Sequence, residues 1–265
     1  MNRIAKKFQE KGSKEKLMSL FITAGYPDLE STVDLIIGFE KNGADMIELG
    51  MPFSDPLADG PTIQYSSDVA IEKGISIDKI MDMVAEIRKY SEIPIILMGY
   101  MNPVLRYGVA KFCERAKEVG VDGFILPDIP VEEGGLIENE ASKVGIPIIY
   151  LVAPNTTDDR MVLADEKSGG FVYCVSVTGV TGARSGEEVT QSVNRFIQRV
   201  RTKVTENPVM IGFGIKSYED AQTISENADG FIVGSALINQ IKHVYPKQNW
   251  KDDVFSFVHS LKFGQ

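Results

Sequence analysis

The chain contains few of the residues that build disulfide frameworks and transition-metal sites. Its 265 residues include two cysteines, Cys113 and Cys174, and two histidines, His243 and His259. Two thiols in a chain of this length are typical of a reducing, intracellular compartment. Neither histidine has a second type of metal ligand beside it in the sequence. We therefore expect neither a disulfide nor a metal site.

A positive net charge and long apolar runs are also missing. The formal net charge is −9, which makes nucleic acids and anionic membranes poor partners. The most apolar run, residues 93–105, is interrupted by two prolines and a glycine and is too short to span a bilayer. Residues 1–16 are basic and polar, without the apolar core of a signal peptide. We expect a cytoplasmic protein that binds neither nucleic acid nor membranes.

Short apolar runs alternate with amphipathic stretches along the chain. The apolar runs predict eight strands, at 18–23, 46–49, 94–98, 123–126, 146–152, 171–175, 208–212 and 230–233. The stretches between them predict helices that include 29–42, 109–119, 132–144, 158–167, 187–203 and 217–226. Strands that are apolar on both faces and are followed by helices indicate a parallel sheet covered by helices. Eight such units favour a closed (β/α)8 TIM barrel over an open doubly wound sheet.

An internal echo supports this repeated architecture. The stretches NGADMIELG, VGVDGFILPD and NADGFIVGS each place a small or turn-forming residue, then an aspartate, then a strand. Gly43 and Gly120 suit the left-handed position that follows a helix. Because no linker or shift in composition interrupts the chain, we expect residues 1–265 to form a single domain.

In a barrel of this kind, functional residues lie at the carboxyl ends of the strands and in the loops that follow them. Glu48 ends the second predicted strand, Asp59 follows in its loop, and Tyr173 lies in the sixth strand. A carboxylate in an apolar strand end is costly unless something pairs with it or requires it. Taken singly, each residue also has a structural interpretation: Glu48 as a cap of backbone amides, Asp59 as a turn residue, Tyr173 as core.

Glycines at the ends of the last two predicted strands indicate a phosphate site. The seventh strand ends in Gly212-Phe213-Gly214, and the eighth is followed by Gly234 and Ser235. Glycines allow close backbone approach, and helix amino ends present free N–H groups. The net negative charge would repel a phosphate, so these local N–H groups must supply the attraction.

Several motifs together resemble the tryptophan synthase alpha subunit family. The most specific is ELGMPFSDPLADGPTIQ at residues 48–64. In family order, the chain also contains FITAGYPD, LMGYMNPVLRYG, DGFILPDIPVEE, LVAPNTTDDR, YCVSVTGVTGAR, GFGI and DGFIVGSAL. The resemblance covers nearly the whole chain and implies a (β/α)8 barrel, in agreement with the strand pattern.

The resemblance implies the retro-aldol cleavage of indole-3-glycerol phosphate to indole and glyceraldehyde 3-phosphate, in the last steps of tryptophan biosynthesis. It makes Glu48 and Asp59 the catalytic pair. It also implies substrate-binding residues, which are Phe21, Ile63, Leu97, Tyr100, Tyr173 and Thr181. The phosphate ligands that it implies are Gly182, Gly214, Gly234 and Ser235.

The chemistry of this cleavage suits two carboxyl groups with different roles. Glu48 is expected to protonate the indole ring at C3 and to take the proton of the glycerol hydroxyl as the C–C bond breaks. Apolar surroundings that raise its pKa would help it hold a proton. Ionised Asp59 is expected to accept a hydrogen bond from the ring N–H, where positive charge develops. This chemistry implies no cofactor or metal in the chain.

The resemblance further implies a tryptophan synthase beta subunit as partner, in an alpha2beta2 heterotetramer. The partner holds pyridoxal phosphate and receives indole through a channel. The residues implied to face it are Asp55, Asn102, Pro103 and Asp128. Two glycine-bracketed loops, residues 52–60 and 176–188, are expected to close over the substrate.

Three other interpretations remain open at this point. One is another phosphate-binding barrel, such as a sugar-phosphate isomerase or the synthase that makes the same indole substrate. The synthase would be expected to carry a lysine at a strand end, whereas lysines here concentrate on predicted helices and in the first 16 residues. The others are a non-catalytic activating subunit and a lyase that releases indole without a partner.

Overall fold

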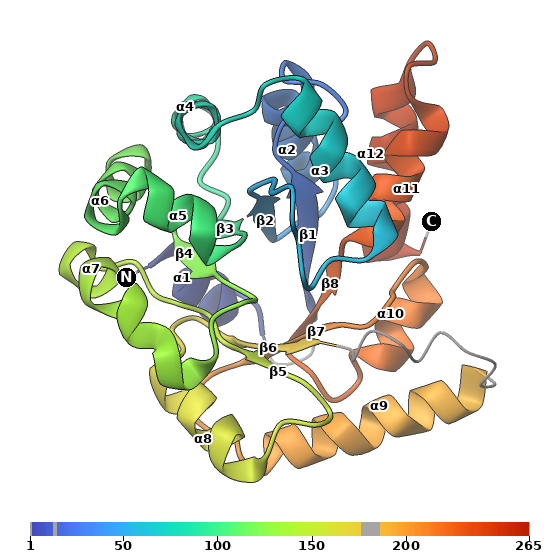
Figure 1. Ribbon diagram of the computed structural model, residues 1–265. Coiled ribbons are helices and arrows are strands. Elements are labelled where there is room, and N and C mark those ends of the chain that lie inside the picture. Colours follow the sequence, from blue (N-terminus) through green and yellow to red (C-terminus); the bar gives the residue numbers. More distant parts are fainter. Residues whose placement is uncertain (1, 13–14, 176–185, 265) are drawn as a thin grey trace.

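Eight parallel strands form the centre of the molecule, and helices surround them (Figure 1). The computed structural model describes residues 2–12, 15–175 and 186–264. The strands are β1 Leu17–Thr23, β2 Met46–Gly50, β3 Ile95–Met98, β4 Gly123–Ile125, β5 Leu151–Val152, β6 Val172–Val175, β7 Val209–Gly212 and β8 Gly230–Val233. Their order is β4-β3-β2-β1-β8-β7-β6-β5.

The sheet closes on itself between β4 and the chain that leads into β5. Phe124 forms a parallel bridge with Ile148. The Phe124 N–H donates to the Pro147 carbonyl at 3.0 Å, and the Ile149 N–H donates to the Phe124 carbonyl at 2.9 Å. These bonds join the two ends of the strand order, so the predicted (β/α)8 barrel is confirmed.

The helices follow the strands around the barrel. They are α1 Arg3–Glu10, α2 Ser31–Lys41, α3 Pro61–Glu72, α4 Ile77–Ile87, α5 Met101–Tyr107, α6 Val109–Val119, the 3-10 helix η1 Val131–Leu136, α7 Glu138–Val144, α8 Asp158–Lys167, α9 Gly186–Arg201, α10 Tyr218–Ile224, α11 Ser235–Val244 and α12 Trp250–Phe263. The predictions for 109–119 and 158–167 are confirmed at both ends. Gly120 ends α6 in the left-handed conformation, with φ of 88°.

Two predicted elements differ from the structure. The strand predicted at 146–152 is reduced to β5 and the single bridge at Ile148. Pro147 has no N–H to donate, so this run cannot form a regular ladder. The helix predicted at 132–144 is divided at Ile137 into η1 and α7. Gly134 and Gly135 weaken the α-helix in its first half.

The core has two layers, one inside the barrel and one between the sheet and the helices. Side chains alternate between them along each strand: Leu17, Met46 and Ile96 belong to the inner layer. Helix α1 closes the amino end of the barrel, because Ile4 is fully buried in this inner layer. The Phe8 ring of α1 packs on Phe171, with 6.3 Å between ring centres.

The three aspartates of the repeated sequence stretches have the same structural role at the amino end of the barrel. Their carboxylates accept hydrogen bonds from the first or second N–H of a neighbouring strand: Asp45 from Met18 at 2.8 Å, Asp122 from Ile95 at 2.9 Å, and Asp229 from Val209 at 2.7 Å. Each aspartate also forms an ion pair with lysine or arginine. The repeated aspartate therefore indicates a repeated hydrogen bond between adjacent strands.

Within residues 2–12, 15–175 and 186–264, no helix is long and apolar enough to cross a bilayer. The same residues contain no group of three or more histidine, cysteine or acidic side chains placed to hold a metal ion. Both cysteines are buried free thiols. The expectation of a single domain stays a prediction.

Candidate active site

A cavity of about 820 Å³ opens at the carboxyl ends of the strands. Most of the predicted substrate and phosphate residues within the described chain line it. They are Phe21, Asp59, Ile63, Tyr173, Gly214, Gly234 and Ser235. The residues come from β1, β6 and the segments after β2, β7 and β8, so the barrel brings together positions that are far apart in the sequence.

Glu48 is fully buried on the inner side of β2. Its Oε1 accepts a hydrogen bond from the Ser19 hydroxyl at 2.8 Å. Its Oε2 is buried without a hydrogen-bond partner among the described residues. Burial raises the pKa of Glu48 to about 8, from an ordinary value of 4.5, although the Ser19 hydrogen bond lowers it. The carboxyl group is therefore predominantly protonated at neutral pH.

Tyr173 connects Glu48 to the cavity. Its side chain is 7% exposed and lines the cavity wall. Burial raises the pKa of its hydroxyl well above the ordinary value, and the Glu48 charge raises it further. Tyr173 belongs to the inner layer of the barrel, the layer on whose side of β2 Glu48 lies. Phe21, the register partner of Glu48 on β1, also lines the cavity.

Asp59 lies on the loop between β2 and α3, and Tyr100 anchors this loop. The Tyr100 hydroxyl accepts a hydrogen bond from the Ala58 N–H at 3.1 Å, and its ring packs on Phe53 with 5.6 Å between centres. Burial raises the pKa of Asp59, while a hydrogen bond with Tyr100 lowers it. Tyr100 thus fixes the loop beside the carboxylate and favours its charged form.

The predicted phosphate residues lie together at the other side of the cavity. Gly234 caps α11 without a side-chain hydrogen bond, and Ser235 begins the helix. The amino end of α11 therefore presents N–H groups toward the cavity. Gly214 has φ of +60°, a conformation that suits glycine. The expected opening of a helix by Gly234 and Ser235 is confirmed.

Lys216 is a cavity residue that the sequence analysis missed. Its side chain lines the same cavity, two positions after Gly214. It brings a positive charge to the cavity wall that also contains Gly214, Gly234 and Ser235. The available signal was its position directly after the GFGI motif, at the carboxyl end of a strand.

The assignment of Leu97 to the indole pocket is wrong by one residue. Leu97 is fully buried in the layer between the sheet and the helices, whereas Met98 lines the cavity. Because side chains alternate along a strand, a shift of one position reverses the face. Thr181 and Gly182 lie outside the described residues, as does most of the loop predicted at 176–188.

The four predicted partner residues lie at the same end of the barrel as the cavity. Asp55, Asn102 and Asp128 are exposed, and Pro103 is half-buried. Asp128 accepts hydrogen bonds from the Met101 N–H at 3.1 and 3.0 Å, which fixes the start of α5. Leu57, on the Asp59 loop, is 91% exposed.

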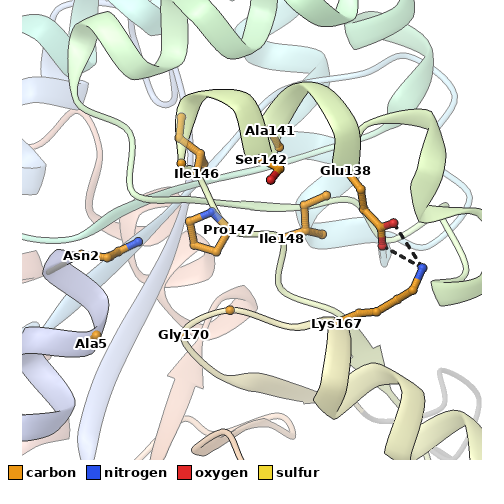
Figure 2. Close-up of a pocket in the computed structure, with 12 residues that line it drawn as sticks. Asn2, Ala5, Glu138, Ala141, Ser142, Ile146, Pro147, Ile148, Lys167 and Gly170 are labelled. Carbon is orange, nitrogen blue, oxygen red and sulfur yellow. Dashed lines mark hydrogen bonds and ion pairs between the residues drawn. The ribbon is translucent and has the colours of Figure 1, made fainter.

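A second cavity, of about 530 Å³, lies at the opposite end of the barrel. Figure 2 shows Asn2, which caps α1, and Ala5 of α1 on one side of it and residues from α7 on the other. Glu138, the acidic residue that lines this cavity, forms an ion pair with Lys167 at 3.0 Å. Among the predicted site residues that the structure describes, none lines this cavity. The amino end of a barrel is where stability rather than chemistry is expected.

A closed (β/α)8 barrel with a cavity at the carboxyl ends of its strands, and with a buried acid of raised pKa on β2, indicates a barrel enzyme. Comparison with known proteins identifies the family to which this enzyme belongs. The family model described as tryptophan synthase alpha chain matches residues 8–262. The tryptophan synthase alpha chain of Thermoanaerobacter sp. (strain X514) is 49% identical over 263 residues, which cover 99% of each chain.

Solved structures agree with the sequence comparison. The crystal structure of the tryptophan synthase alpha chain from Legionella pneumophila subsp. pneumophila has a TM-score of 0.89 and 38% identity, covering 99% of this chain and 96% of that chain. A chain of the tryptophan synthase complex from Pyrococcus furiosus has a TM-score of 0.82 and 34% identity, covering 94% and 99%. The chain belongs to the tryptophan synthase alpha chain family. The predicted function is thereby confirmed: the family is a lyase family, and its alpha subunit cleaves indole-3-glycerol phosphate in tryptophan biosynthesis.

Proposed function

We propose that this chain performs the cleavage with Glu48 as the acid and base and Asp59 as the electrostatic partner. The observation that carries the proposal is the state of Glu48: fully buried, protonated near neutral pH, and with one oxygen unpaired among the described residues. An acid held in this state can donate a proton to carbon, which an ordinary surface glutamate, ionised at neutral pH, cannot do efficiently.

Glu48 gives one proton to the substrate and takes another from it, so it ends each turnover in its starting state. In the first step, the carboxyl group protonates indole C3, and positive charge spreads toward the ring nitrogen. In the second step, the Glu48 carboxylate takes the proton of the hydroxyl on the carbon attached to the ring. That C–C bond breaks, its electron pair restores the aromatic ring, and the hydroxyl oxygen becomes the aldehyde oxygen of glyceraldehyde 3-phosphate. Glu48 ends protonated, ready for another turnover.

Asp59 is assigned to the positive charge that develops on the ring. Its loop position at the cavity lets the carboxylate accept a hydrogen bond from the indole N–H. Because this bond strengthens as charge develops, it stabilises the transition state more than the bound substrate. The Tyr100 hydroxyl, which holds the loop through Ala58, keeps the carboxylate in place.

The rest of the cavity is assigned to the two ends of the substrate. The apolar side chains of Phe21, Ile63 and Met98 suit the flat indole ring. Gly214, Gly234 and Ser235 are assigned to the phosphate, which the amino end of α11 attracts. Thr181 and Gly182 keep their expected roles as loop and phosphate residues. The proposal assigns no cofactor or metal to this chain, because both proton transfers have a donor and an acceptor on Glu48.

We also propose a tryptophan synthase beta subunit as partner, in an alpha2beta2 assembly in the cytoplasm. The exposed Asp55, Leu57, Asn102 and Asp128 support this proposal, because they follow β2, β3 and β4 and so lie at the same end of the barrel as the cavity. The similar chain from Pyrococcus furiosus comes from a tryptophan synthase complex. Pyridoxal phosphate belongs to the partner in this scheme. Two buried free thiols, Cys113 and Cys174, fit a reducing compartment.

The test is indole release from indole-3-glycerol phosphate by the purified protein, with and without a beta subunit. We expect slow release that the beta subunit strongly accelerates, because the partner orders the loops at the cavity mouth. Fast release that the beta subunit does not change would overturn the partner proposal and indicate a lyase that acts alone. No release in either condition would overturn the catalytic assignment.

A further inference from the structure

The two carboxyl oxygens of Glu48 have different surroundings. Oε1 accepts the Ser19 hydroxyl at 2.8 Å, whereas Oε2 has no hydrogen-bond partner in the part of the chain that the structure describes. Glu48 and Ser19 are both completely buried. In such surroundings a single hydrogen bond determines which of two otherwise equivalent oxygens is available for chemistry.

The sheet places this serine with little freedom. Ser19 is paired in register with Met46 on β2 and with Ile232 on β8, both inner-layer residues. It is a buried hydroxyl in a strand that is otherwise apolar apart from Thr23 at its end. A buried hydroxyl without a partner is costly, and Glu48 Oε1 is the acceptor that the structure gives it. The bond is therefore built into the barrel rather than formed by a mobile side chain.

We propose that Ser19 is a positioning residue that holds Oε1 of Glu48 and so makes Oε2 the oxygen that exchanges the proton with the substrate. The proposal rests on the proposed function of Glu48. In the resting state the proton resides on Oε2, because Oε1 is already occupied by the serine hydrogen. When Oε2 gives its proton to indole C3, the Ser19 hydroxyl remains bonded to Oε1 and stabilises the new carboxylate. Oε2 then takes the hydroxyl proton in the second step.

Few other groups influence this carboxyl group. On β6, Tyr173 lies in the inner layer of the barrel, and burial, which raises the pKa of its hydroxyl, keeps it uncharged at neutral pH. The groups that set the pKa of Glu48 are burial, which raises it, and the Ser19 hydrogen bond, which lowers it. On β1 and β3, the register partners Phe21 and Ile96 carry no charge. Removal of the serine hydroxyl should therefore raise the pKa of Glu48 still further.

The experiment compares the wild-type protein with Ser19→Ala, a slightly smaller residue that the strand accommodates. The Glu48 carboxyl is titrated by carbon-13 NMR of protein with labelled glutamate, and its resonance is assigned by its loss in Glu48→Gln. The pH dependence of kcat and KM for indole release is measured in parallel, with the beta subunit present. Ser225→Ala is the matched control, because Ser225 is also fully buried and donates to the Ala221 carbonyl in α10.

We expect the Glu48 midpoint in Ser19→Ala to rise by about one pH unit, as for loss of a hydrogen bond to a charged group. We also expect the pH limb that reports this acid to move by the same amount, and kcat at pH 7 to fall about tenfold with KM unchanged. Ser225→Ala should keep the wild-type midpoint and the wild-type kcat.

An unchanged midpoint in Ser19→Ala would overturn the proposal, and so would a shifted midpoint with an unchanged kcat. In the second case the hydrogen bond would tune the acid without orienting it. The NMR titration requires no substrate. If the wild-type protein released no indole, the proposed function would fail, while the link between Ser19 and Glu48 would still be measured.

Discussion

Asp122 and Glu48 are both buried acids of the barrel, and they lie at opposite ends of it. Before β4, Asp122 accepts the Ile95 N–H and pairs with Arg88 at 2.7 Å and with Arg3 at 3.2 Å. At the carboxyl end, Glu48 has one hydroxyl donor and one unpaired oxygen among the described residues. The Ile95 N–H and the two arginines lower the pKa of Asp122 against the effect of its burial. Glu48 has only the Ser19 hydroxyl to oppose burial, which raises its pKa to about 8. Burial alone does not distinguish the two roles, but the number of partners does.

The comparison predicts that changes at the carboxyl end affect chemistry more than stability. Asp59→Asn removes the charge that is assigned to the indole N–H while it keeps the shape of the side chain. We expect kcat to fall by about 10²–10³-fold, as for removal of one transition-state hydrogen-bond group. Steady-state indole release measures this. Asp68→Asn, an exposed acid on α3, should retain wild-type turnover. Equal kcat in both variants would remove Asp59 from the mechanism.

Changes at the amino end of the barrel should affect stability more than chemistry. Asp122→Ala leaves the largely buried Arg88 without its acid, although this arginine also donates to backbone carbonyls of Gly120 and Ile93. We expect the free energy of unfolding to fall by about 3 kcal/mol, at the lower end of the range for a broken buried pair. Urea unfolding measures the loss. Asp82→Ala breaks a more exposed pair with Arg115 and should cost less than about 1 kcal/mol. Similar losses in the two variants would contradict the structural role of Asp122.

The protonated state of Glu48 predicts a pH dependence of stability. Its pKa is about 8 in the folded protein and 4.5 ordinarily, so the unfolded chain loses this proton first as the pH rises. Below about pH 4.5 the group costs nothing; the cost grows through neutral pH and levels off above about pH 8. Between pH 6 and 9 the wild-type protein should lose about 3 kcal/mol more stability than Glu48→Gln. The wild-type protein and Glu48→Gln share all other titratable groups. If their free energies of unfolding changed in parallel with pH, Glu48 would have to be ionised in the folded state.

The smallest effect is expected for the cation at the phosphate end. Lys216→Ala removes one exposed positive charge from the cavity, which is worth about 1 kcal/mol near a protein surface. We expect KM to rise about fivefold with kcat unchanged, and the salt dependence of KM to weaken. Lys89→Ala, a surface lysine paired with Glu86 far from the cavity, is the control. Identical KM values would show that backbone N–H groups alone attract the phosphate.

The sequence was sufficient for the barrel because the strands depend on local patterns, whereas the roles of Glu48 and Asp59 came from the family resemblance and stay predictions. Apolar runs define the strands, and the turn-rich segment after Glu48 defines the end of β2. It failed for Leu97 because a run that is apolar on both faces does not show which side chain faces inward. In the run at 146–152, the apolar pattern hid the effect of Pro147, and the fifth strand is limited to the last two residues, Leu151–Val152.

The contacts of Glu48 could not be predicted from the sequence at all. Ser19 lies 29 positions from Glu48, and their hydrogen bond depends on the parallel register of β1 and β2. A single serine in an apolar strand gives no signal that distinguishes a packing residue from a partner of an acid. Lys216 was overlooked for a similar reason, since a charged residue after a glycine-rich turn is ordinarily taken as solvated surface.

The most direct test of the account is the turnover of Glu48→Gln beside that of Asp229→Asn, with both variants folded and the beta subunit present. Glutamine keeps the size of the side chain but cannot move a proton, and Asp229 serves the strands at the far end of the barrel. The account predicts that Glu48→Gln loses at least about 10³-fold in kcat, while folded Asp229→Asn stays within about twofold of the wild-type value. Wild-type turnover in Glu48→Gln would contradict it.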